Sequence, residues 1–219
     1  MNPVAAQPVS PEVNPPPRFG PVTVEPPRHG RIAAIRNDPL PVTGAHPPLV
    51  AIVGAHGGAG ATTLARWWAP AADSERCWPA SPHTTQLVTI AARLCLPGLI
   101  SCAERLREWR AELAPDGVVV VGVVLTAARP GKVPAAIRRY RTLIEDLAPA
   151  VWAIGWHEEL LERELDELAR FHPGDRPPPR RAPLTSTVPA DVHHVGTDLI
   201  DHITRIRKTS RRQQDWNKS

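Results

Sequence analysis

Apolar residues gather in four short runs along the chain, and amphipathic stretches separate these runs. The runs cover residues 49–54, 86–92, 117–126 and 151–156. Each has the length of a strand, and the valine-rich third run indicates burial on both faces of a sheet. Amphipathic periodicity predicts helices over residues 62–69, 99–113, 134–147, 158–171 and 191–207. Strands that alternate with helices predict an α/β fold, with a mostly parallel sheet flanked by helices.

Proline is distributed unevenly and sets the expected domain boundaries. Of the 27 prolines, 13 lie in residues 1–48 and 6 in residues 172–190. Because proline lacks an amide donor and fixes φ, residues 1–48 are predicted to be a disordered Pro-rich leader. The α/β domain is expected over residues 49–206, with the Pro-rich loop 172–190 inside it, and a basic tail follows at 207–219.

The net charge of +4 is concentrated at the end of the chain. Residues 204–219 carry six basic side chains against one acid, Asp215, so the rest of the chain is close to neutral. Three alternatives stay open for this tail: a solvated terminus, a contact for nucleic-acid phosphates, or a helix on a membrane surface. The apolar face of the predicted last helix is narrow, which argues against the membrane contact.

Cysteine usage and the lack of long apolar segments favour a cytoplasmic location. The three cysteines are an odd number and form no C-x-x-C pair, which argues against a disulfide framework. No basic region followed by an apolar stretch begins the chain, and the longest apolar run is too short to span a bilayer.

A glycine-rich turn joins the first predicted strand to the first predicted helix. It provides the candidate cofactor-binding residues His56, Gly57, Gly58, Ala59, Gly60, Ala61, Thr62 and Thr63. Glycines let successive amides point to one side, where together they bind an anion. Thr62 stands where a hydroxyl binds Mg²⁺. Loops at the same sheet edge carry Arg93, Arg129, Lys132 and His157, and Arg129 is added to the cofactor-binding set.

Residues 56–62 resemble the deviant Walker A loop of the MinD/ParA-type P-loop ATPases, whose pattern is K-G-G-x-G-K-[ST]. Residues 117–132, 150–167 and 188–203 also resemble later segments of that family. The turn G-G-A-G-x-T-T-L and the run G-W-H-E-E-L-L further resemble a small family of degenerate relatives. The resemblance implies a P-loop NTPase-like fold, with ATP or another nucleotide and Mg²⁺ as cofactors.

Two departures from that pattern concern charge. His56 and Ala61 replace both lysines, and loss of a charge-assisted contact weakens triphosphate binding by about 1.5–3 kcal/mol. No acidic residue is predicted to end a strand, because Asp73 and Asp116 fall in predicted loops. Phosphoryl transfer depends on Mg²⁺ and on positive charge, so the balance is against an enzyme, although the question stays open.

The predicted function is therefore that of a degenerate P-loop protein. It would be a weak or non-hydrolysing nucleotide- or phosphate-binding module that acts through protein partners, and the resemblance implies plasmid or chromosome maintenance. Two alternatives stay open: an active ATPase completed in trans by a partner, for which a homodimer is one form, and a nucleic-acid adaptor that uses the basic tail. A turn that is merely structural, with no cofactor, is the remaining reading.

Overall fold

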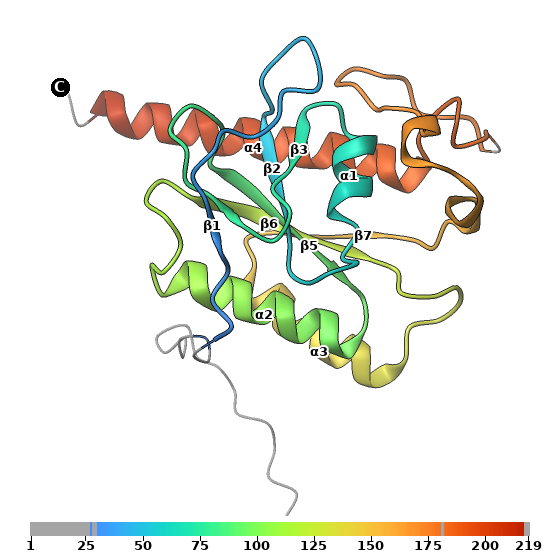
Figure 1. Cartoon of the computed structure of the whole chain (residues 1–219), viewed down its shortest axis with the longest axis horizontal. Helices are drawn as coiled ribbons and strands as arrows, with labels where there is room; N and C mark the ends of the chain where they lie inside the picture. Colours follow the sequence, from blue (N-terminus) through green and yellow to red (C-terminus); the bar gives the residue numbers. More distant parts are fainter. Residues whose placement is uncertain (1–26, 28–29, 181, 217–219) are drawn as a thin grey trace, which may run out of the picture.

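A five-stranded parallel sheet forms the centre of the protein, as the computed structural model in Figure 1 shows. The structure describes residue 27, residues 30–180 and residues 182–216. Across the sheet, the strands are β3 (Ala71–Asp73), β2 (Val50–Gly54), β5 (Leu87–Arg93), β6 (Val119–Thr126) and β7 (Val151–Ile154). The predicted α/β class and parallel sheet are confirmed, and each predicted strand ends within two residues of an observed one.

Helices cover both faces of this sheet. Two helices, α1 (Ala61–Trp67) and α4 (Ala190–Trp216), share a buried apolar cluster with one face. The other face packs against α2 (Leu96–Arg110) and α3 (Ala135–Leu147), which lie across the sheet from α4 in Figure 1. Burial on both sides explains why the strand sequences are almost continuously apolar instead of alternating.

The direction of the chain across the sheet reverses between β2 and β5. From β2 the chain passes through α1 to β3 on one side, whereas from β5 it passes through α2, β6 and α3 to β7 on the other side. The helices that follow β2 and β5 therefore leave toward opposite faces, and the loops at the carboxyl ends of these two strands diverge. In doubly wound sheets, such a reversal is where ligands bind.

Residues 30–48 pack against the sheet face that carries α2. Within this segment, β1 (Ile35–Arg36) pairs in parallel with β4 (Trp78–Pro79), and Leu40 is buried. The Ala33 amide donates a 2.9 Å hydrogen bond to Glu108 Oε1 on α2. The sequence assigned residues 1–48 to a disordered leader. Residues 1–26, 28 and 29 lie outside the described residues, but residues 30–48 run along this face and contribute Leu40 to the core that also holds β2.

The helix predicted over residues 158–171 is wrong. The chain there forms two short 3₁₀ turns, η1 (Glu158–Glu162) and η2 (Leu165–Glu167), and then runs extended. Phe171 donates its amide to Trp67 O at 2.7 Å and accepts the Ala69 amide at 3.0 Å. These bonds to the segment after α1 draw the chain out of the helical conformation that the leucine and glutamate spacing favours.

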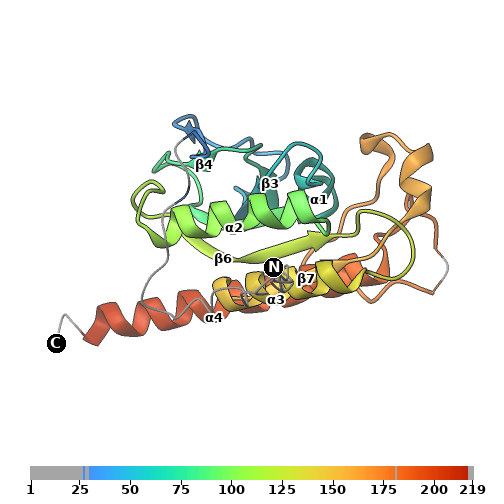
Figure 2. The same cartoon turned by 90° about the horizontal axis from the view of Figure 1, so that it is seen from below.

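The last helix is longer than predicted. It was expected over residues 191–207, and α4 continues to Trp216 through most of the predicted basic tail. Figure 1 and Figure 2 both show the C-terminal part of α4 projecting past the sheet. Residues 217–219 lie outside the described residues.

Candidate functional site

The glycine-rich turn lies at the carboxyl end of β2, at the reversal point of the sheet. It connects Gly54 to the start of α1, as the sequence predicts. Gly58 and Gly60 have φ values of +75° and +90°, which side chains disfavour, so the backbone path itself requires these two glycines. Gly57 has no such φ, and a methyl group added there would meet no atom within 4 Å. Neither backbone conformation nor packing therefore demands glycine at residue 57.

Several amides of this turn lack partners. Among the described residues, the amides of Gly57, Gly58 and Gly60 have no hydrogen-bond acceptor. Gly57 and Gly58 are exposed. The turn thus has backbone donors that no acceptor of the described residues uses, and free amides in a glycine-rich turn are a feature of anion-binding loops.

The side chain of His56 forms hydrogen bonds with the backbone of the turn and of β5. Its Nε2 accepts a 3.1 Å hydrogen bond from the Arg93 amide, and its Nδ1 lies 2.8 Å from Gly57 O. Because Nε2 accepts a hydrogen bond, the proton is on Nδ1 and the imidazole is neutral. His56 was predicted to bind the cofactor, but both of its ring nitrogens are bonded to the backbone, so it supplies no cation to a ligand.

The predicted absence of an acid at a strand end is wrong. Asp73 is the last residue of β3, directly beside β2, and its Oδ2 accepts a 2.6 Å hydrogen bond from Thr62 Oγ1. Its other oxygen accepts the Glu75 amide at 2.6 Å. A threonine hydroxyl and an aspartate carboxylate thus meet at the start of α1. Both groups offer oxygen atoms, which are the ligands that Mg²⁺ prefers.

Arg93 joins the turn to the loop after β6. Besides its amide contact with His56, its Nε donates to Gly58 O at 2.9 Å and its Nη1 donates to Ala127 O at 3.0 Å. Arg129, which the sequence assigned to the cofactor, is exposed in the loop after β6 and lines neither of the two cavities described below. Arg93, which the sequence placed at this edge without a role, is the cation that contacts the turn.

A cavity of about 250 Å³ lies beside the turn. Its lining joins Gly60 and Thr63 of the turn, Arg93 of β5 and Trp67 of α1 to leucines of η1 and η2. A second cavity of about 520 Å³ lies between the chain after β7 and the residues that precede α4. Trp156 and His157 line both cavities.

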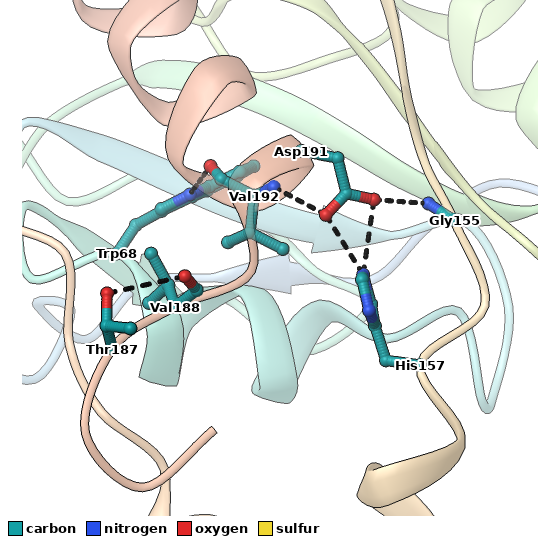
Figure 3. Close-up of polar contacts among 7 residues, drawn as sticks. All are labelled: Trp68, Gly155, His157, Thr187, Val188, Asp191 and Val192. Carbon is teal, nitrogen blue, oxygen red and sulfur yellow. Dashed lines mark hydrogen bonds and ion pairs between the residues drawn. The ribbon is translucent and has the colours of Figure 1, made fainter. Parts of the chain in front are cut away.

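Asp191 closes the turn after β7. Figure 3 shows its carboxylate accepting hydrogen bonds from the Gly155 amide at 2.7 Å and the Val192 amide at 2.9 Å, with His157 Nε2 3.1–3.2 Å away. Burial raises the pKa of Asp191. The hydrogen bonds from His157 and Gly155, the charge of His157 and the bond from Val192 outweigh that effect, so the pKa lies below its usual value. A carboxylate of the protein itself thus occupies this turn.

Cys102 is a buried residue of α2 and offers no nucleophile. Burial raises the pKa of its thiol to about 12, so the thiol stays protonated. No group of three or more histidine, cysteine or acidic side chains among the described residues is arranged to hold a metal ion. No helix in the described part of the chain has the length and apolar character needed to cross a membrane.

No protein-family model, curated protein or solved structure matches the chain. The resemblance of residues 56–62 to a deviant Walker A loop therefore stays a prediction. Sequence reasoning missed Asp73, because β3 has three residues and shows no periodic pattern. The tripeptide Ala71-Ala72-Asp73 directly after Pro70 is the signal that could have revealed it.

Proposed function

We propose that this protein binds a nucleotide through its phosphate group at residues 56–63. It would hydrolyse the nucleotide weakly or not at all, and it would act through protein partners. The glycine-rich turn carries the proposal, because three of its amides lack acceptors among the described residues, and an added Cβ at Gly57 or Gly58 would meet nothing within 4 Å. Unpaired donors gathered in one exposed turn favour an anion as the ligand. The position at the reversal point of a doubly wound sheet supports the same conclusion.

Thr62 and Asp73 would hold Mg²⁺ beside this phosphate. Their oxygens already lie 2.6 Å apart, and a magnesium ion takes oxygen ligands from a few protein groups, water and phosphate. The ion would offset negative charge on the phosphate, which the neutral His56 does not. The proposed function therefore includes Mg²⁺ as a cofactor of nucleotide binding.

The position of Asp73 also favours a second function, an ATPase completed in trans. An acid beside the turn removes one of the two reasons for expecting no hydrolysis. The missing positive charge at residue 61 would then come from a partner, as arginine side chains from partner proteins do in other phosphoryl-transfer enzymes. Leu161, which is 68% exposed, lies with Leu165 at the lining of the smaller cavity and offers an apolar contact for such a partner.

Calorimetric titration with ATP and Mg²⁺, together with a phosphate-release assay, tests the proposal. We expect weak binding that strengthens with Mg²⁺ and no turnover by the isolated chain. Ala61→Lys should tighten binding by about tenfold, because it adds a charge-assisted contact. Ala61→Met is the matched control, since it adds similar bulk without charge at a residue that is 9% exposed.

Three outcomes separate the alternatives. Turnover by the isolated chain would defeat the non-hydrolysing reading, and turnover only with a partner would establish the second function. No binding of ATP, pyrophosphate or phosphate by the wild type would leave the turn as a structural element and end both.

A further inference from the structure

The glycine-rich turn carries no positive charge of its own. Residues 54–63 include no lysine or arginine, and the one histidine is neutral because its Nε2 accepts a hydrogen bond. Backbone amides alone bind a multiply charged anion weakly in water, because the anion gives up strong hydration when it binds. A phosphate ligand at this turn therefore needs a cation from another element.

Arg93 is held at the turn in a fixed position. Two of its five side-chain donors are used, one at Gly58 O and one at Ala127 O, which leaves donors on Nη1 and Nη2. The backbone beneath it is equally constrained, because the space at Gly98 is filled by Arg93 O, which lies 2.2 Å from the position of an added Cβ. A guanidinium anchored in this way loses little rotamer freedom when it binds an anion.

The charge of Arg93 is not cancelled by the protein. It forms no ion pair with a carboxylate of the described residues. The other basic side chains that line the smaller cavity are paired: Arg163 with Glu159 at 3.5 Å and Glu167 at 3.9 Å, and His157 with Asp191. Among the described residues that line this cavity, Arg93 is thus the arginine whose positive charge is not paired with a carboxylate.

Trp67, which contributes to the lining of the same cavity, carries a buried donor that lacks an acceptor. Trp67 is 2% exposed, and its indole Nε1 has no hydrogen-bond partner among the described residues. Indole nitrogen is a donor only, so the partner it lacks is an acceptor atom. This nitrogen is closed off from the cavity, so the charge of Arg93 is what the lining offers to a ligand, and that charge favours an anion.

We propose that Arg93 is the phosphate-binding cation of this site and supplies from β5 the charge that the turn lacks. The inference rests on the proposed function and extends it by naming the residue on which the affinity depends. The ligand class is a phosphoryl group bound between Arg93 and the free amides of Gly58 and Gly60. The contacts of Arg93 with Gly58 and Ala127 keep its side chain at the turn before the ligand arrives.

The test is calorimetric titration of the full chain with inorganic phosphate, with pyrophosphate and with ATP plus Mg²⁺. Arg93→Gln, which removes the charge but keeps an amide donor, should weaken binding of each anion by about tenfold or more. Arg93→Lys keeps the charge and should bind within about fivefold of the wild type. Arg163→Ala is the matched control, because that arginine lines the same cavity with its charge already paired, and its affinity should change less than twofold.

Thermal unfolding of each variant shows whether Arg93 acts through its charge on the ligand or through its structural contacts with Gly58 and Ala127. A merely structural Arg93 would make the lysine and glutamine variants equally poor binders, with equally lowered melting temperatures, and this result would overturn the inference. Wild-type affinity in Arg93→Gln would overturn it as well, while leaving the proposed function in place. If the wild type binds none of the three anions, the proposed function and this inference are both wrong.

Discussion

Two turns at the same edge of the sheet differ in whether their backbone amides have an acceptor within the protein. After β7, the Gly155 amide is bonded to the carboxylate of Asp191, which also accepts the Val192 amide. After β2, the amides of Gly57, Gly58 and Gly60 have no acceptor among the described residues, and the carboxylate of Asp73 at the start of α1 is bonded to Thr62 and to the Glu75 amide instead.

The difference supports the proposal that the turn after β2 receives an external ligand. An anion already belongs to the turn after β7, so its donors are satisfied and its role is to hold α4 against the sheet. The turn after β2 has donors, glycines and a cation at its side but no internal anion. Exposed amides bond to water when they have no acceptor within the protein, so an anion could replace that water without breaking a bond inside the fold.

The largest effect on this comparison is expected from Gly98→Ala, which disturbs the packing beneath the turn after β2. An added Cβ would stand 2.2 Å from Arg93 O and 3.0 Å from His56 Nε2, and the first neighbour is backbone that cannot swing away. We expect a loss of about 2–3 kcal/mol in the free energy of unfolding, measured by urea denaturation, together with weaker phosphate binding.

Gly44→Ala is the control for this variant, because an added methyl there meets nothing within 4 Å. It should change the free energy of unfolding by less than about 0.5 kcal/mol. If Gly98→Ala were equally harmless, the close packing of α2 on Arg93 and His56 would be refuted.

How far the sequence predicts this architecture depends on the length of each element. The long valine-rich strand β6 and the turn between β2 and α1 are predictable, because burial on two faces and a strand–glycine–helix order leave clear patterns. The strands β1, β3 and β4 have two or three residues, too few for any period, and so the acid at the end of β3 was missed.

Sequence-based prediction also fails where tertiary contacts override the local pattern. Residues 158–171 have the leucine spacing of a helix, but the bonds between Phe171 and the segment after α1 override it. The contact of Arg93 with the turn is beyond sequence reasoning for a similar reason, since 35 residues separate it from the carbonyl of Gly58 to which it donates. Long-range hydrogen bonds of this kind leave no local signal.

The second prediction concerns the turn after β7, where Asp191 is the common acceptor. Asp191→Ala leaves the amides of Gly155 and Val192 and the ring of His157 without their common acceptor, and we expect it to lower the free energy of unfolding by about 2 kcal/mol at pH 7. Asp191→Asn keeps one acceptor oxygen and should cost about half as much. Phosphate affinity should stay within twofold, because the carboxylate serves the turn after β7.

The pH dependence of this destabilisation has a defined sign. The folded-state pKa of Asp191 lies below the usual 3.8, so its contribution to stability is present above pH 3.8 and is lost as pH falls through the lower folded value. The difference between wild type and Asp191→Ala, followed by urea denaturation from pH 7 downward, should therefore shrink below pH 3.8. A difference that stayed constant into that range would mean that the carboxylate is not stabilised by these bonds.

The smallest change in stability is expected from Gly57→Ala, and for that reason it bears most directly on whether the turn after β2 awaits a ligand. Residue 57 has no positive φ, and an added methyl meets no atom within 4 Å, so the free energy of unfolding should stay within about 0.5 kcal/mol of the wild type. The methyl would nevertheless stand beside the free amides, where a phosphate must approach the backbone closely. Calorimetric affinity for pyrophosphate should then fall by about tenfold with stability unchanged. Unchanged affinity would show that the ligand does not approach residue 57, and the phosphate contacts of the turn would then be confined to the amides of Gly58 and Gly60.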